Sequence, residues 1–384
     1  GTYLAAYEKK YMSALINVMF ISLLSLQGVL GVLFSSSMLF GGFVVSYLIS
    51  FKAWKLDIFV VSAGIACGVI FLMERNIFVI YDYLRFSSPI LAYSIGRRLG
   101  LGVHPKVIAS LIIVSCFFFF TVSIGEFFYA FITDMSEQEL RKFSKLSPFG
   151  FLFLWFLVLS WDKSSGWLRY RRLFIFMGAT AFILLQSRTV LSIFALSSLI
   201  YIAVNARFKG ILLYILVSSL IFFLNYEFLA ELVTKGFSEF FYNPSIDGES
   251  TAIIYNNWRG FEIYSVLKAM SESSVISWFL GQGVGSSVPL GFTVSVTESL
   301  AVDSLYQVHS LYFEILYKFG LLGLGCLFYV FYKMVTDKRL GKLYLRLILV
   351  AVMALASLST SALIASWLIF IWWGYQSQSQ NRTF

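Results

Sequence analysis

Long hydrophobic stretches separated by short polar links make up most of this chain. A helix needs about 20 apolar residues to cross the hydrocarbon core of a bilayer, and about twelve stretches approach that length. The predicted spans are residues 13–32, 36–51, 57–73, 78–95, 107–129, 147–161, 172–187, 189–204, 211–226, 307–332, 344–358 and 361–376. Asp82, Arg85 and Pro89 interrupt the fourth span and make it the weakest. The pattern predicts an all-α polytopic membrane protein of about twelve transmembrane helices.

About 80 residues between Tyr226 and Gln307 break this pattern with polar sequence. They divide the chain into about nine transmembrane helices in 1–226, a loop subdomain in 227–306, and C-terminal transmembrane helices in 307–384. The loop is expected to be helical, with an amphipathic helix at its start and a second helix beginning near Trp258. Polar groups are costly in lipid, and this long polar loop leads directly into a membrane helix. We therefore expect the functional residues in or beside this loop.

The distribution of charge orients the predicted spans. With the N-terminus in the cytoplasm, about 19 of the 29 Lys and Arg residues fall in cytoplasmic loops, together with only about four acids. Cytoplasmic loops of membrane proteins carry such an excess of basic residues. We therefore expect both termini in the cytoplasm and the long loop on the outer face of the membrane.

Composition excludes several other classes of protein. Charged residues make up 13% of the chain and the mean hydropathy is +0.81, whereas a soluble domain averages about 25% charged residues. The net charge of +9 does not favour nucleic acid as a partner, because the basic residues do not lie on a soluble face. Cys67, Cys116 and Cys326 lie in apolar stretches, so neither a disulfide framework nor a Cys-based metal site is predicted.

Three cationic or titratable residues, Arg188, Arg259 and His309, lie on the same predicted side of the membrane. Each also has an ordinary structural explanation. Arg188, in a turn between two spans, could extend to the lipid headgroups. Arg259 could pair with Glu262 on an exposed helix, and His309 could cap the next helix. The glycine run GQGVG (281–285) could be a plain tight turn.

Four motifs in a fixed order are more specific than these residues taken singly. They are SRT at 187–189, WRGFE at 258–262, FLGQGVGSS at 279–287 and VHSLYFEILYKFGLLGLG at 308–325. This order resembles the O-antigen ligase/polymerase superfamily of bacterial envelopes. In that family a Ser-Arg helix end is followed by a loop Arg, a glycine turn and a His-Asn/Ser-x-Tyr segment. Ser310 stands where Asn is commoner, and the N-terminal half matches only in hydropathy.

The resemblance implies a GT-C-like glycosyltransferase of the bacterial inner membrane with a periplasmic active site. Donor and acceptor would be undecaprenyl-pyrophosphate-linked oligosaccharides, and the inverting displacement would need no metal or other cofactor. Arg188 and Arg259 would bind the pyrophosphate, because a guanidinium offers two donors to phosphate oxygens. His309 would act as general base toward the acceptor hydroxyl. Secondary candidates for substrate binding are Glu262, Tyr306, Tyr312 and Arg85, followed by Lys318 and Arg75.

The family offers two reactions at the same kind of site. A polymerase moves the glycan onto the sugar of a new lipid-linked repeat unit, whereas a ligase moves it onto lipid A–core. The outer loops hold about 16 acids against about 10 bases, which favours the polymerase over a ligase with a phosphate-rich acceptor. A chain-length regulator protein is a further expected partner. A lipid-linked oligosaccharide flippase is the remote alternative, because no internal repeat, discontinuous helix or midplane charge is evident in the sequence.

Overall fold

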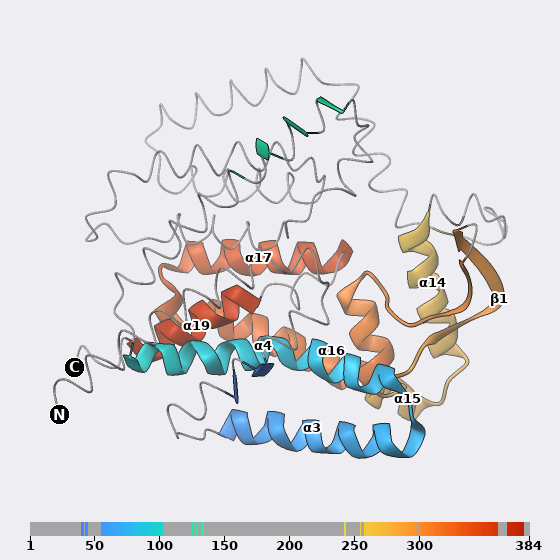
Figure 1. The fold of residues 1–384 in the computed structure, drawn as a ribbon, viewed down its shortest axis with the longest axis horizontal. Coiled ribbons are helices and arrows are strands. Elements are labelled where there is room, and N and C mark those ends of the chain that lie inside the picture. The colour runs from blue at the N-terminus through green and yellow to red at the C-terminus, as the bar shows by residue number, and fades with distance from the viewer. Residues whose placement is uncertain are drawn as a thin grey trace.

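The computed structural model describes residues 55–102, 257–297, 300–359 and 367–379, with isolated residues in 40–44 and 121–133 and at positions 242 and 254. These parts are mainly helical (Figure 1). Their elements are α3 (Lys55–Glu74), α4 (Ile77–Gly102), α14 (Trp258–Ser271), α15 (Val275–Leu280), β1 (Val288–Thr297), β2 (Leu300–Leu305), α16 (Leu311–Thr336), η2 (Lys338–Leu340), α17 (Leu343–Ser359) and α19 (Trp367–Ser379).

Two of the described helices, α3 and α16, are long and apolar enough to cross a membrane. They correspond to the predicted spans 57–73 and 307–332. On α3, Leu72 and Met73 are 75% and 79% exposed, which suits a lipid-facing surface better than a water-facing one. α17 and α19 correspond to the last two predicted spans. Most of the remaining spans lie outside the described residues, so the total of about twelve stays a prediction.

The weakest predicted span forms α4, a continuous helix of 26 residues with Pro89 inside it. The two charged residues that weakened the prediction, Asp82 and Arg85, are fully buried. Both form ion pairs with side chains of α16. These two charged residues lower the mean hydropathy of α4 and so weaken its signal as a span. In the structure both face protein partners.

Helix α4 is fixed to its neighbours by close backbone contact and by a third buried ion pair. A Cβ atom added at Gly96 would lie 1.9 Å from the carbonyl oxygen of Ile371 in α19, and one at Gly374 would lie 2.1 Å from that of Tyr93. Small residues allow membrane helices to approach this closely. At the same end of α4, Arg98 Nη2 lies 2.6 Å from Asp57 Oδ2 of α3, with both side chains buried.

The long loop contains a β-hairpin, which departs from the all-α prediction. β1 and β2 pair antiparallel, with Val288 opposite Leu305 and Val294 opposite Val302. Val288, Leu290 and Leu305 are buried against Phe261 and its neighbours on α14. The hairpin and α14 lie together at one end of the helices (Figure 1). The alternation of apolar and polar residues from Val288 onward is the period of a half-buried strand, which the expectation of a helical loop overlooked.

Candidate functional site

The site is built around a break in α16. Gly320 has φ 63° and ψ −161°, so the helix is interrupted there and continues in a new direction. The break leaves the carbonyl groups of Tyr317 and Lys318 without helical partners. The glycine-rich turn after α15 supplies them, because the backbone N–H of Gln282 donates to Tyr317 at 2.7 Å and that of Gly283 to Lys318 at 3.0 Å. Unpaired carbonyls are costly in a membrane helix, so this turn completes α16.

The glycine turn and the break in α16 approach each other so closely that only glycine fits at one position in each. A Cβ atom at Gly281 would lie 2.3 Å from the backbone of Lys318, and one at Gly320 would lie 2.4 Å from the backbone of Phe279. Both residues also have positive φ. The run GQGVG is therefore more than an isolated tight turn, since its backbone is a structural part of the neighbouring span.

We expect Gly320→Ala to lower the thermal unfolding temperature of the purified protein. The substitution combines a backbone conformation that costs about 1–3 kcal/mol for other residues with a clash against Phe279. Gly325→Ala, in the same helix, is the matched control. A Cβ there meets nothing within 4 Å, so it should be neutral or mildly stabilising. Equal unfolding temperatures for the two variants would contradict this account of the break.

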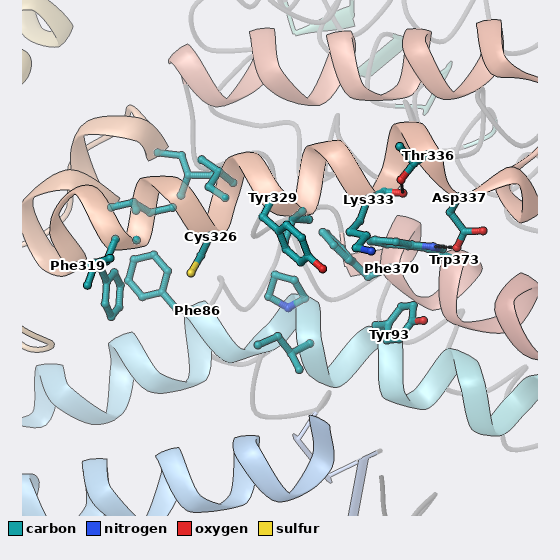
Figure 2. Close-up of a pocket in the computed structure, with 18 of the residues that line it drawn as sticks. Phe86, Tyr93, Phe319, Cys326, Tyr329, Lys333, Thr336, Asp337, Phe370 and Trp373 are labelled. Atoms are coloured by element: carbon teal, nitrogen blue, oxygen red, sulfur yellow. Dashed lines mark hydrogen bonds between the residues drawn. The ribbon is translucent and has the colours of Figure 1, made fainter. Parts of the chain in front are cut away.

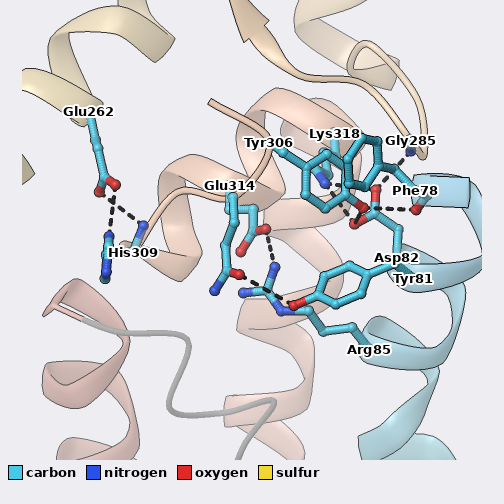
Figure 3. Close-up of polar contacts among 11 residues, drawn as sticks. Phe78, Tyr81, Asp82, Arg85, Glu262, Gly285, Tyr306, His309, Glu314 and Lys318 are labelled. Atoms are coloured by element: carbon cyan, nitrogen blue, oxygen red, sulfur yellow. Dashed lines mark hydrogen bonds and ion pairs between the residues drawn. The ribbon is translucent and has the colours of Figure 1, made fainter. Parts of the chain in front are cut away.

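Asp82 of α4 is the centre of a buried polar cluster beside the break (Figure 3). Lys318 Nζ lies 2.6 and 2.7 Å from its two carboxylate oxygens, and the backbone N–H of Gly285 donates to Oδ2 at 2.7 Å. The Tyr306 hydroxyl lies 2.6 Å from Oδ1, and Asn76 Nδ2 donates to the Gly285 carbonyl at 3.0 Å. The cluster joins α4, α16, the glycine turn and the end of the hairpin.

A second ion pair lies one helical turn away on both helices. Arg85 Nη1 contacts Glu314 Oε1, and both side chains are at most 1% exposed. Together with Asp82 and Lys318 this gives two acids and two bases in a neutral cluster. Because Arg85, Lys318 and Tyr306 already have partners here, the packing of α4 on α16 accounts for them. Their predicted contact with substrate stays a prediction.

Glu262 and His309 form the other polar centre, on the opposite side of the view in Figure 3. Glu262 Oε1 lies 2.7 Å from His309 Nδ1 and accepts from Trp258 Nε1 at 2.8 Å, and Oε2 accepts from the His309 backbone N–H at 3.0 Å. Glu262 is buried, whereas the His309 side chain is 54% exposed. Among the described residues no hydrogen bond reaches His309 Nε2. The carboxylate thus fixes one face of the imidazole and leaves the other accessible.

The electrostatics of this pair follow from the buried carboxylate. Its hydrogen bond raises the pKa of His309 above the ordinary value, against the opposing effects of partial burial and of the nearby Arg259 charge. A histidine in this position is a stronger base than a free one, and it gains a proton at Nε2 while Nδ1–H donates to Glu262. Such an arrangement can accept a proton from a hydroxyl group bound beside Nε2.

Of the remaining predicted site residues, the structure describes Arg259 and Tyr312 but not Arg188. Arg259 lies in the first turn of α14, half-buried and three residues before Glu262, close enough to influence the pKa of His309. Tyr312 donates its hydroxyl proton to the Ala354 carbonyl of α17 at 2.9 Å, which ties α16 to α17. Arg188 lies outside the described residues, so its proximity to His309 stays a prediction.

Sequence reasoning treated Asp82 as an interruption and gave no role to Glu314. The signal that could have identified both is the complementary spacing of charges. Asp82 and Arg85 are three residues apart on one helix, and Glu314 and Lys318 four residues apart on another. Charges at such spacings lie on one helix face, and inside a membrane they need partners.

A scan against protein-family models finds no match to this chain, and a search of curated proteins finds none either. Function therefore has to be inferred from the residues themselves.

Proposed function

We propose that this chain is a membrane glycosyltransferase resembling the O-antigen polymerases. It would move an undecaprenyl-pyrophosphate-linked glycan onto the sugar of a new lipid-linked repeat unit at the periplasmic face of a bacterial inner membrane. The proposal includes a GT-C-like arrangement of about twelve spans and an inverting, metal-independent reaction. It rests on the order of the four sequence motifs and on the environment of His309.

The observation that carries the proposal is the accessible Nε2 of a histidine whose Nδ1 is held by a buried carboxylate. In the proposed reaction the acceptor hydroxyl gives its proton to His309 Nε2 as its oxygen bonds to the anomeric carbon. The bond from that carbon to the pyrophosphate breaks, and its electron pair leaves with the phosphate. Glu262 stabilises the imidazolium that forms, so in this reaction it acts as a positioning residue, while its contact with substrate stays a prediction.

The departing pyrophosphate needs positive charge close to the histidine. Arg259 meets this need, since it precedes Glu262 by one helical turn and its charge reaches His309. A guanidinium suits phosphate oxygens because its planar fork donates two hydrogen bonds at once. In this proposal Arg188 is the second arginine at the phosphate.

A transporter was set aside partly because no discontinuous helix was evident, and the break at Gly320 corrects that expectation. In transporters such breaks expose backbone groups to a substrate or ion cavity. Here the freed carbonyls of Tyr317 and Lys318 accept hydrogen bonds from the glycine turn, and the nearby charges are paired with each other. The break is thus used to attach the outer loop, which fits the glycosyltransferase better.

Glu262→Gln should shift the pH dependence of transfer. A general base works in its neutral form, so the rate should rise with pH through the pKa of His309, which Glu262 raises. Removing the carboxylate lowers this pKa, so the rise should move to lower pH and the plateau rate should fall. Glu272→Gln, an exposed acid after the same helix, is the control and should leave the profile unchanged. An unshifted profile for Glu262→Gln would remove Glu262 from the mechanism.

Reconstitution tests the function directly. The full chain in proteoliposomes is given purified undecaprenyl-pyrophosphate-linked repeat units without lipid A–core. Growth of longer lipid-linked glycans supports the polymerase. Product that forms only after lipid A–core is added identifies a ligase instead. Movement of the lipid-linked unit across the bilayer without any new glycosidic bond would overturn the glycosyltransferase and indicate a flippase.

A further inference from the structure

A long groove lies between α4, α16 and α19 and runs from Leu311, at the start of α16, to Arg339, just beyond its end (Figure 2). Its volume is about 1060 Å³, at the upper end of the range for small-molecule sites. One part of the groove is apolar, with Phe86, Ile90, Phe319 and Leu322 among its walls. It has no part in the proposed transfer reaction.

The other end of the groove is basic. Lys333, Lys338 and Arg339 line it, and all three are exposed. Lys333 lies over the ring of Tyr329, with Nζ 5.3 Å from the centroid, so its charge is held at this end of the groove. These cations gather where α16 ends and η2 begins, so the groove changes from apolar to positively charged along its length.

The one acid among the lining residues, Asp337, offsets only one of the three cations, since its Oδ1 lies 3.5 Å from Arg339 Nε. Asp337 Oδ2 accepts a hydrogen bond from Trp373 Nε1 at 2.7 Å, and Oδ1 accepts from the Arg339 backbone N–H at 3.0 Å. Its two oxygens thus already have donors within the protein. Three cations against this one carboxylate leave a net positive charge at the groove mouth.

The dimensions of the groove suit a lipid chain. Eleven residues of unbroken helix separate Leu322 from Lys333, a rise of about 16 Å, which matches the thickness of one leaflet of the hydrocarbon core at about 15 Å. A small soluble anion would use the basic end and leave the apolar walls exposed. A molecule with an anionic head and one long apolar chain would satisfy both parts of the groove.

We propose that this groove binds an anionic phospholipid, with its headgroup phosphate at Lys333, Lys338 and Arg339 and one acyl chain along the apolar walls of α4 and α16. The site is separate from His309 and Glu262 and goes beyond the proposed transfer reaction. The lipid would fill the gap between α4 and α16, with its headgroup at the end away from the buried Asp82 cluster.

Cys326 reports on occupancy, because this free thiol is exposed and lines the middle of the groove. In a Cys67→Ser, Cys116→Ser background it is the only thiol of the full chain. Its labelling by a bulky maleimide is measured in nanodiscs of phosphatidylcholine with increasing phosphatidylglycerol. We expect phosphatidylglycerol to protect Cys326, and inorganic phosphate to give no protection. Protection by phosphate alone, or none by phosphatidylglycerol, would overturn the proposal.

Charge variants test the headgroup contact. Each basic residue near a bilayer surface contributes about 1 kcal/mol toward anionic lipid, so Lys333→Ala with Lys338→Ala should raise the half-protecting phosphatidylglycerol fraction about 30-fold, or abolish protection. The control, Lys342→Ala with Lys268→Ala, removes the same charge at exposed positions outside the groove and should protect like the parent. Equal protection in both double variants would overturn the headgroup site, and unchanged unfolding temperatures show that both variants fold.

Discussion

His309→Gln is expected to slow glycan transfer by about 100- to 10,000-fold, the usual contribution of a general base. The amide can still donate a hydrogen bond to Glu262 but cannot accept a proton from the acceptor hydroxyl. The variant should therefore fold and bind lipid-linked substrate while failing in the chemical step. The measurement is the single-turnover rate at saturating donor in proteoliposomes, compared with substrate affinity and with the unfolding temperature.

The chain offers a matched control for this substitution. His104 is its other histidine and belongs to none of the four motifs. His104→Gln should transfer glycan at the parent rate. If His309→Gln also retained the parent rate, the histidine would not be the base and Glu262 would have a purely structural role. A loss of affinity with an unchanged single-turnover rate would place His309 in binding and not in proton transfer.

Asp82→Ala is expected to cost about 3–5 kcal/mol of stability, because it leaves the Lys318 ammonium buried without its carboxylate. It also removes the acceptor for the Gly285 N–H and the Tyr306 hydroxyl. The glycine turn should then detach more readily from α4. The measurement is the free energy of unfolding in mixed detergent micelles, with the unfolding temperature as a second observable.

A double variant separates the lost ion pair from a general disruption of packing. Asp82→Asn with Lys318→Met removes both charges and keeps an oxygen that can accept from the Gly285 N–H. Replacing both members of a buried pair is often close to neutral, so this protein should regain most of the stability lost in Asp82→Ala. If the double variant were as unstable as the single one, the buried charge would not be the cause.

The helices α3 and α16 follow the hydropathy of the sequence, whereas the charges of α4 and the break in α16 share a physical cause that hydropathy does not show. α3 and α16 are apolar through their own residues, so a local window finds them. α4 contains the charged residues Asp82 and Arg85, and both meet partners more than 200 residues later. The local sequence around α4 does not show that residues so far along the chain will pair with these charges. The break at Gly320 is hidden for the same reason, since its missing hydrogen bonds come from another segment.

At the candidate site, too, the sequence indicates the residue types but not which residues contact each other. The chemical types at Arg259, Glu262 and His309 indicated an anion site with a base. The local rule paired Glu262 with Arg259, three residues away on the helix. In the structure the carboxylate instead bonds to Trp258 and to His309, which is 47 residues further along the chain. Sequence spacing could nominate these residues, but only the packing of α14 against the start of α16 could select the partner of Glu262.

The separation of Asp82 from Lys318 along the chain also constrains how the protein is made. The glycine turn precedes the break in α16 by fewer than 40 residues, so it is already synthesised when that helix enters the bilayer. α4, in contrast, is synthesised long before Glu314 and Lys318 exist. Each unpaired charge at the centre of a membrane helix costs about 3 kcal/mol at insertion. As a membrane span, nascent α4 would have to be held by the translocon or by earlier helices until α16 arrives, which would make its final placement a late step in biogenesis.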